Sequence, residues 1–264
     1  MIATERFRVP SNDGVEISVQ KAGAGPALVL IHGSLLNGAM AWGAVLPKLA
    51  ERFTVYAMDR RGRAPSGDAK KYSVANEADD IASVVEKIGV QVTILAHSYG
   101  AFATLEALHR LKTVSHLILY EPPVILKPVD SDPVSDRMDQ ALAANDLEQL
   151  VTIFLRDQIQ APPERIAMMR SSPIWPIVLP IAPTLAREAR SVNSYRASAE
   201  RLAKWNAPTT MLLGSETQGL LRDAAFFVRD AIPGCRLVVL EGQGHGAMMD
   251  APDFFVSKII EISA

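Results

Sequence analysis

The sequence has little of several features that define other classes of protein. Only one of its 264 residues is a cysteine, Cys235, so no disulfide can form within the chain and a reducing compartment is expected. The longest apolar stretch, Ile174–Leu185, is interrupted by prolines and is shorter than the ~20 residues that a membrane-spanning helix needs. The first residues contain no apolar segment of signal-peptide length. We therefore expect a cytoplasmic protein that does not bind a membrane.

The chain also has no large excess of positive or negative residues, because its formal net charge is -2. Nucleic acid is therefore not an expected partner. The densest basic cluster, Arg60, Arg61 and Arg63, is too short for a binding tail and predicts a solvated loop. The chain has no phosphate-binding loop, no dinucleotide fingerprint and no histidine–carboxylate cluster with the spacing of metal ligands. No metal and no other cofactor is expected.

Apolar sequence, by contrast, is sufficient for a large core, since 48% of the residues are hydrophobic. Short apolar runs alternate with segments of helical periodicity, and this pattern predicts an α/β fold with a mostly parallel sheet and helices on both faces. Strands are expected at Ala27–Ile31, Phe53–Met58, Val92–Ala96, Val114–Tyr120, Thr209–Leu213 and Arg236–Leu240. Helices are expected at Ala41–Ala50, Asn76–Ile88, Tyr99–Arg110, Leu220–Ala231 and Pro252–Ile262.

Two further strands are expected near the N-terminus. The runs Phe7–Val9 and Val15–Gln20 flank Asp13 and Gly14, a dipeptide that favours a hairpin turn. An antiparallel hairpin at one edge of the sheet would bring the number of strands to eight.

One long segment, residues 124–206, departs from the alternating pattern. It contains no clear strand, and its many prolines separate short helical patches. It also lies between two strands of the alternating pattern. We therefore expect a core of residues 1–123 and 207–264, with residues 124–206 as a helical cap inserted over one edge of the sheet.

The most specific motif is Ala96-His97-Ser98-Tyr99-Gly100, which joins an expected strand to an expected helix. A tight turn at this place requires small residues two positions before and after the serine, and Ala96 and Gly100 meet that requirement. Such a turn would raise the Ser98 hydroxyl above the C-terminal end of the sheet. Taken alone, the motif is also compatible with a serine that merely caps a helix.

Two more motifs follow expected strands. The segment Gly242-Gln243-Gly244-His245-Gly246 places a histidine on a glycine-rich loop, where its unperturbed pKa near 6.5 suits a general base. The segment Ile31-His32-Gly33-Ser34 follows the first buried strand. His32 is expected to be structural, and Trp42 is expected to pack in the core.

These three motifs, in this order and each at a strand end, resemble the α/β-hydrolase superfamily, in its serine hydrolase branch with a helical cap. The resemblance extends over nearly the full chain. It implies that Ser98 is the nucleophile and His245 the general base. It also implies an oxyanion hole made by the backbone N–H groups of Tyr99 and Ser34, with Leu35 as the second candidate for the latter position.

The segment Asp59–Gly67 resembles the loop that follows the fourth strand of this family. Ala64 stands where that loop usually has a glycine. We expect the residues of this loop to have structural roles.

The acid that should orient His245 departs from the family pattern, in which an aspartate follows the penultimate strand. Thr217 occupies that position and cannot carry a negative charge. Glu121, directly after Val114–Tyr120, is the favoured replacement, because some relatives place their acid at the end of that strand. Glu216 is the alternative acid.

A serine nucleophile favours acyl transfer followed by hydrolysis, and disfavours the alkyl–enzyme chemistry of relatives that use aspartate. The sequence therefore predicts a hydrolase for a small or medium carboxylic ester, lactone or thioester. The alternatives are a C–C bond hydrolase, a perhydrolase or a lyase on the same scaffold, or a ligand receptor without catalytic activity, which the threonine at position 217 suggests.

The expected substrate is a small, apolar molecule. Leu35, Trp175 and Met248 are candidates for its pocket, although such residues more often pack the cap against the core. The sequence is compatible with a homodimer.

Overall fold

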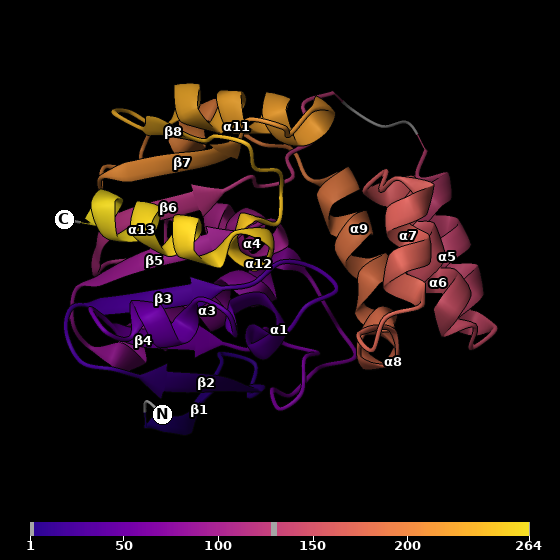
Figure 1. Cartoon of the computed structure of the whole chain (residues 1–264), viewed down its shortest axis with the longest axis horizontal. Helices are drawn as coiled ribbons and strands as arrows, with labels where there is room; N and C mark the ends of the chain where they lie inside the picture. Colours follow the sequence, from indigo (N-terminus) through magenta and orange to yellow (C-terminus); the bar gives the residue numbers. More distant parts are fainter. Residues whose placement is uncertain (1–2, 128–130, 264) are drawn as a thin grey trace. The chain divides into compact units, whose positions relative to one another are not determined.

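The computed structural model describes residues 3–127 and 131–263, which form two compact units (Figure 1). The larger unit comprises the segment that ends at Gly33, the segment Asn37–Val124 and the segment that begins at Ala197. The smaller unit comprises Ser34–Leu36 and the described part of Ile125–Arg196. Residues 197–206, which we expected in the inserted cap, group with the larger unit.

An eight-stranded sheet is the centre of the larger unit, with the strand order β1-β2-β4-β3-β5-β6-β7-β8. The pairs β1–β2 and β2–β4 are antiparallel, and every other pair is parallel. This is the mostly parallel sheet, with a hairpin at its edge, that the sequence predicts. The strands are β1 Thr4–Pro10, β2 Glu16–Ala22, β3 Ala27–Ile31, β4 Thr54–Met58, β5 Val92–His97, β6 Val114–Tyr120, β7 Thr209–Gly214 and β8 Arg236–Leu240.

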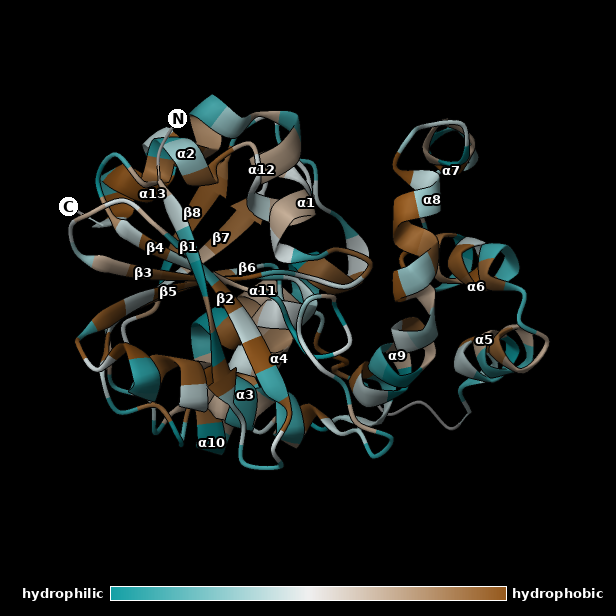
Figure 2. Cartoon of the chain, turned by 90° about the horizontal axis from the view of Figure 1, so that it is seen from below, coloured by the Kyte–Doolittle hydropathy of each residue, from teal (hydrophilic) through white to brown (hydrophobic). Residues whose placement is uncertain are grey.

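Helices cover both faces of this sheet, and most apolar residues of its central strands are buried between them. In Figure 2, α2 and α13 lie on one face, and α3 and α4 lie on the other. All five residues of β3 are buried, as expected for a strand that has no face in water. The helices of this unit are α1 Gly38–Trp42, α2 Leu46–Leu49, α3 Val74–Ile88, α4 Tyr99–Ala107, α10 Ala199–Leu202, α11 Gly219–Ala231, α12 Ala247–Asp250 and α13 Pro252–Ser263.

The expectation of one helix over Ala41–Ala50 is wrong, because the chain forms two short helices there, α1 and α2. Pro47 lies in the first turn of α2. In a continuous helix its missing N–H would leave the carbonyl of Gly43 without a partner, and its ring would clash with that carbonyl. The proline therefore starts a new helix. Trp42 is fully buried, as expected.

The smaller unit is helical, and no strand occurs among its described residues. Within it, α5 packs against α6 and α9. Its elements are α5 Pro133–Ala143, α6 Leu147–Ile153, the π-helical turn Phe154–Gln158, α7 Pro163–Arg170, α8 Trp175–Val178, the 3-10 segment Leu179–Thr184 and α9 Leu185–Ser194. In the described ranges of the whole chain, no helix combines the length and the apolar character needed to cross a membrane.

Candidate active site

Ser98 occupies a strained turn between β5 and α4. Its backbone has φ 53° and ψ −124°, a conformation that L-residues rarely adopt and that costs about 1–3 kcal/mol. Its N–H donates to the carbonyl of Tyr120 at 2.8 Å, which fixes the turn to β6. The Ser98 side chain makes no capping hydrogen bond to α4, and its φ is not that of an ordinary N-cap. The hydroxyl is therefore not used to cap the helix.

Two glycines allow the chain to approach this turn closely. A Cβ atom on Gly100 would lie 2.5 Å from the carbonyl oxygen of His32, so no side chain fits there. A Cβ atom on Gly33 would lie 2.8 Å from Cβ of Ser98. The segment that follows β3 and the turn that carries Ser98 are thus in direct contact.

The loop after β8 brings His245 next to this turn. Nε2 of His97, the residue before Ser98, lies 2.9 Å from the carbonyl oxygen of His245, and the two imidazole rings have centroids 4.5 Å apart. The hydroxyl of Tyr120 donates to the carbonyl of Gly244 and accepts from the N–H of Ala247. Buried side chains from β5 and the end of β6 therefore hold both sides of the His245 loop.

His97 is itself buried, and burial is the largest cause that lowers its pKa well below 6.5; the neighbouring His245 imidazole lowers it further. A neutral His97 can donate from only one ring nitrogen. Because Nε2 faces a carbonyl oxygen, Nε2 carries the proton. His97 is thus a fixed donor to the backbone of His245.

Glu121 makes the contact that a catalytic histidine requires. Its carboxylate is fully buried, with Oε2 2.5 Å from Nδ1 of His245 and Oε1 accepting from the N–H of Gly214 at 2.7 Å. Because a carboxylate only accepts, Nδ1 carries the imidazole proton and Nε2 keeps a free lone pair. Glu121 also has a positive φ, 49°, so the site contains a second strained residue.

The side chain of His245 is 36% exposed, so the imidazole is not sealed inside the protein. Among the described residues, no hydrogen bond joins the imidazole to the hydroxyl of Ser98. Hydrogen bonds of this kind are often long in enzymes without substrate and shorten in the complex.

The alternative acid lies differently. Glu216 is exposed and contacts the histidine loop through its backbone, with its N–H 3.0 Å from the carbonyl oxygen of Gln243. Thr217, at the position where the family usually has aspartate, is buried, and its hydroxyl has no hydrogen-bond partner in the described part of the chain. Of the two candidate carboxylates, only Glu121 is bonded to His245.

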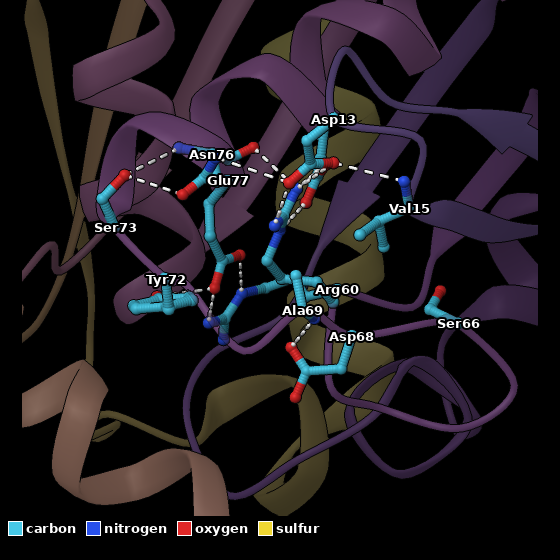
Figure 3. Close-up of polar contacts among 12 residues, drawn as sticks. Asp13, Val15, Arg60, Ser66, Asp68, Ala69, Tyr72, Ser73, Asn76 and Glu77 are labelled. Carbon is cyan, nitrogen blue, oxygen red and sulfur yellow. Dashed lines mark hydrogen bonds and ion pairs between the residues drawn. The ribbon is translucent and has the colours of Figure 1, made fainter.

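The basic cluster contradicts the sequence expectation of a solvated loop, because Arg60, Arg61 and Arg63 are all fully buried. Arg60 forms two hydrogen bonds with the carboxylate of Glu77 in α3 (Figure 3). Arg61 pairs with Asp80 and Asp13. These carboxylates come from α3 and the N-terminal hairpin, which the local sequence around the arginines does not reveal. Such pairing is what allows these arginines to be buried, because an unpaired charge inside a protein is strongly destabilising.

The remaining predicted residues are divided between the two units. Tyr99 is buried in the larger unit, where it opens α4, and Met248 is fully buried in α12. Ser34, Leu35 and Trp175 belong to the smaller unit. Leu35 has a positive φ, 56°, and Leu35 and Trp175 are each only 5% exposed.

Sequence reasoning missed the contribution of His97 and Tyr120 to this site. Their signal was present, since each directly precedes a candidate catalytic residue at the end of a strand. It could not be recognised without knowing that the loop after β8 returns to these two strand ends.

Comparison with known proteins supports this architecture. A solved α/β hydrolase from Sphaerobacter thermophilus superimposes with a TM-score of 0.88 and 31% identity, over 98% of this chain and all of that one. A pimeloyl-[acyl-carrier protein] methyl ester esterase from Aeromonas hydrophila is 26% identical over 94% of this chain and 98% of its own length.

Another similarity is local. The probable oxidoreductase EphD of Mycobacterium tuberculosis is 38% identical over 119 residues, which are 42% of this chain but only 20% of that protein. The model of the alpha/beta hydrolase family matches residues 28–258, which include the Ser98 turn, Glu121 and the His245 loop. The chain belongs to the alpha/beta hydrolase family.

Proposed function

We propose that this protein is a serine hydrolase that cleaves small or medium carboxylic esters, lactones or thioesters through an acyl-enzyme. Ser98 is the nucleophile, His245 the general base and Glu121 the acid. The observation that carries the proposal is the 2.5 Å contact between Nδ1 of His245 and Oε2 of Glu121. It leaves Nε2 as the basic nitrogen of a histidine held beside a strained serine.

The geometry supports a two-step reaction. His245 Nε2 removes the Ser98 proton as Oγ attacks the carbonyl carbon, and Glu121 stabilises the imidazolium that forms. The oxyanion accepts hydrogen bonds from the backbone N–H of Tyr99 and, as the sequence predicts, that of Ser34. The imidazolium then protonates the leaving alcohol. In the second step, His245 activates a water molecule that hydrolyses the acyl-enzyme and restores the Ser98 hydroxyl.

Ester chemistry is favoured by the similarity to the Aeromonas methyl ester esterase, which spans nearly both chains. The small, apolar substrate that the sequence predicts is compatible with an uncharged acyl or alcohol group.

A ligand receptor without activity was suggested by the threonine at position 217. Glu121 removes this argument, because a buried carboxylate already contacts His245 from another strand. The contact between Glu121 and His245 therefore supports acyl transfer rather than a receptor without activity.

The test is hydrolysis of p-nitrophenyl acetate and butyrate by the wild-type protein and by Ser98→Ala. We expect turnover that Ser98→Ala abolishes, and stoichiometric labelling of Ser98 by a fluorophosphonate. Equal turnover in both proteins would disprove the assignment of the nucleophile. Absence of both turnover and labelling would favour the receptor. Labelling without ester turnover would favour the C–C hydrolase, perhydrolase or lyase alternatives.

A further inference from the structure

The carbonyl group of Gly33 accepts hydrogen bonds from two buried side chains. Nδ1 of His32 lies 2.9 Å from this oxygen, and Nη1 of Arg60 lies 3.0 Å from it. The backbone N–H of Arg60 donates to Nε2 of His32 at 3.1 Å. Nε2 must therefore be unprotonated, and Nδ1–H is the donor to Gly33.

This arrangement is consistent with a neutral His32. Burial lowers the pKa of His32 well below 6.5, and the positive charges of Arg60 and Arg63 lower it further. Both ring nitrogens have partners, so the tautomer is fixed. The orientation of the Gly33 carbonyl is fixed with it.

The same carbonyl group belongs to the peptide that supplies the predicted oxyanion donor, Ser34 N–H. A peptide group is planar and trans, so its C=O and N–H point in opposite directions. Fixing the carbonyl of Gly33 therefore fixes the direction of the following N–H. Hydrogen bonds to the carbonyl also polarise the peptide and strengthen its N–H as a donor.

Arg60 contacts the second proposed donor residue as well. Its guanidinium carbon lies 4.4 Å from the centroid of the Tyr99 ring, within the range of a cation–π contact. The Tyr99 hydroxyl lies 2.6 Å from that of Tyr72, which donates to Glu77 at 2.8 Å. Figure 3 shows Tyr72 and Arg60 meeting at the Glu77 carboxylate. Glu77 therefore binds both Arg60 and the hydroxyl of Tyr72, which in turn contacts the hydroxyl of Tyr99.

We propose that Arg60 is a positioning residue for transition-state stabilisation, which holds the Gly33–Ser34 peptide and Tyr99 from one guanidinium group. This inference rests on the proposed function, because it assigns to Arg60 a role in forming the oxyanion hole. Arg60 acts through these two neighbours and does not contact the substrate. Its effect is on the step that places negative charge on the carbonyl oxygen.

Arg61 provides a matched control. It is equally buried, lies in the same loop and forms comparable ion pairs with Asp80 and Asp13. Its hydrogen bonds within the described ranges go to those carboxylates and to the carbonyl of Asn76, not to Gly33. Substitution of either arginine should therefore disturb folding to a similar extent. Only substitution of Arg60 should affect stabilisation of the oxyanion.

The experiment compares Arg60→Lys with Arg61→Lys. The readouts are kcat and KM for p-nitrophenyl butyrate per folded molecule, thermal unfolding, and inhibition by an alkyl boronic acid, which forms a tetrahedral adduct with serine. Loss of an oxyanion donor lowers kcat by about 10²–10³-fold, so its misplacement in Arg60→Lys should lower kcat by about 10-fold or more. We expect boronic acid binding to weaken in parallel, with KM unchanged.

For Arg61→Lys we expect kcat and boronic acid binding to stay within about twofold of wild type, with a similar loss of thermal stability. Equal losses of kcat in the two variants would overturn the proposal, as would an unchanged kcat in Arg60→Lys. If Ser98→Ala retained turnover, the proposed function itself would fail. If Ser98→Ala lost turnover but Arg60→Lys and Arg61→Lys had the same kcat and the same boronic acid binding, only the role of Arg60 would be disproved.

A milder variant keeps the test decisive if Arg60→Lys does not fold. Tyr72 is partly exposed, and Tyr72→Phe removes the hydroxyl that joins Glu77 to Tyr99. We expect kcat to fall about 3-fold with KM unchanged, because a small displacement at a reacting centre has a measurable effect on rate. An unchanged kcat in Tyr72→Phe would then refute the role of this network.

Discussion

The ends of β6 and β7 both meet the loop that carries His245, but they contribute different groups. From β6, Tyr120 and Glu121 contact the loop through fully buried side chains. From β7, the contacts are mainly of the backbone, with Ser215 N–H donating to Leu240 and Glu216 N–H donating to Gln243. The end of β7 thus supports the backbone of the loop, whereas the end of β6 supplies the side chains that orient the imidazole.

Under the proposed function, the acid of such a site need not come from one particular strand. What His245 requires is a buried carboxylate within hydrogen-bond distance of Nδ1, fixed by a second partner. Glu121 meets both conditions, because the N–H of Gly214 at the end of β7 holds its other oxygen. The strained φ of Glu121 is the local cost of reaching across from β6.

The largest expected effect concerns the acid itself. Glu121→Gln should lower kcat by roughly 10³–10⁴-fold, because an amide neither stabilises the imidazolium nor selects the Nδ1–H tautomer. Steady-state kinetics on p-nitrophenyl butyrate would measure it. Glu216→Gln is the matched control, and we expect it to retain kcat within about twofold. The opposite result would transfer the role to Glu216.

A second experiment moves the carboxylate from β6 to β7. Thr217→Asp, introduced into Glu121→Gln, places an acid at the position usual for the family, where the threonine hydroxyl has no partner among the described residues. We expect it to recover at least about 10-fold of the lost kcat, because a carboxylate then occupies the position from which the family usually orients its histidine. No recovery would show that the β6 position is required for more than charge.

A smaller effect is expected for the other buried contact from β6. Tyr120→Phe removes the hydroxyl that bonds Gly244 and Ala247, so the His245 loop loses one support. Burial raises the pKa of Tyr120, so the hydroxyl is protonated under all ordinary conditions and the prediction does not depend on pH. We expect kcat to fall about 5-fold. We also expect a loss of about 1–3 kcal/mol in unfolding free energy, measured by urea denaturation.

The smallest effect is expected on the β7 side. Ser215→Ala deletes an exposed hydrogen bond from the N–H of Gly242 to the serine hydroxyl. We expect a loss of about 0.5–1 kcal/mol in unfolding free energy and no change in kcat. A large loss of activity in Ser215→Ala would show that the end of β7 also contributes to the orientation of His245.

Most of the sheet could be predicted from the sequence, because its strands are continuous apolar runs between turn residues. The strands Ala27–Ile31, Val114–Tyr120 and Arg236–Leu240 have the predicted bounds. The Ser98 turn could be located for a similar reason, since a sharp strand-to-helix bend restricts the residues around it. The break between α1 and α2 is not apparent from the apolar pattern, because that pattern continues across Pro47.

The buried arginines could not be predicted in the same way. Arg60 and Arg61 are charged residues in a loop with proline and glycine, a composition that is typical of solvent exposure. Their burial depends on Asp13, Glu77 and Asp80, which only the folded chain brings to them. Charge compensation between distant segments leaves no periodic pattern in a sequence.

The sequence by itself determined the order of the strands along the chain and the positions of Ser98 and His245 at strand ends. These properties follow from local sterics and from apolar burial, which neighbouring residues encode. Only the tertiary structure decided which carboxylate meets His245 and which arginine meets Gly33. Hydrogen bonds of this kind depend on ångström distances between segments that are far apart in the chain, and these distances exist only after the sheet has formed.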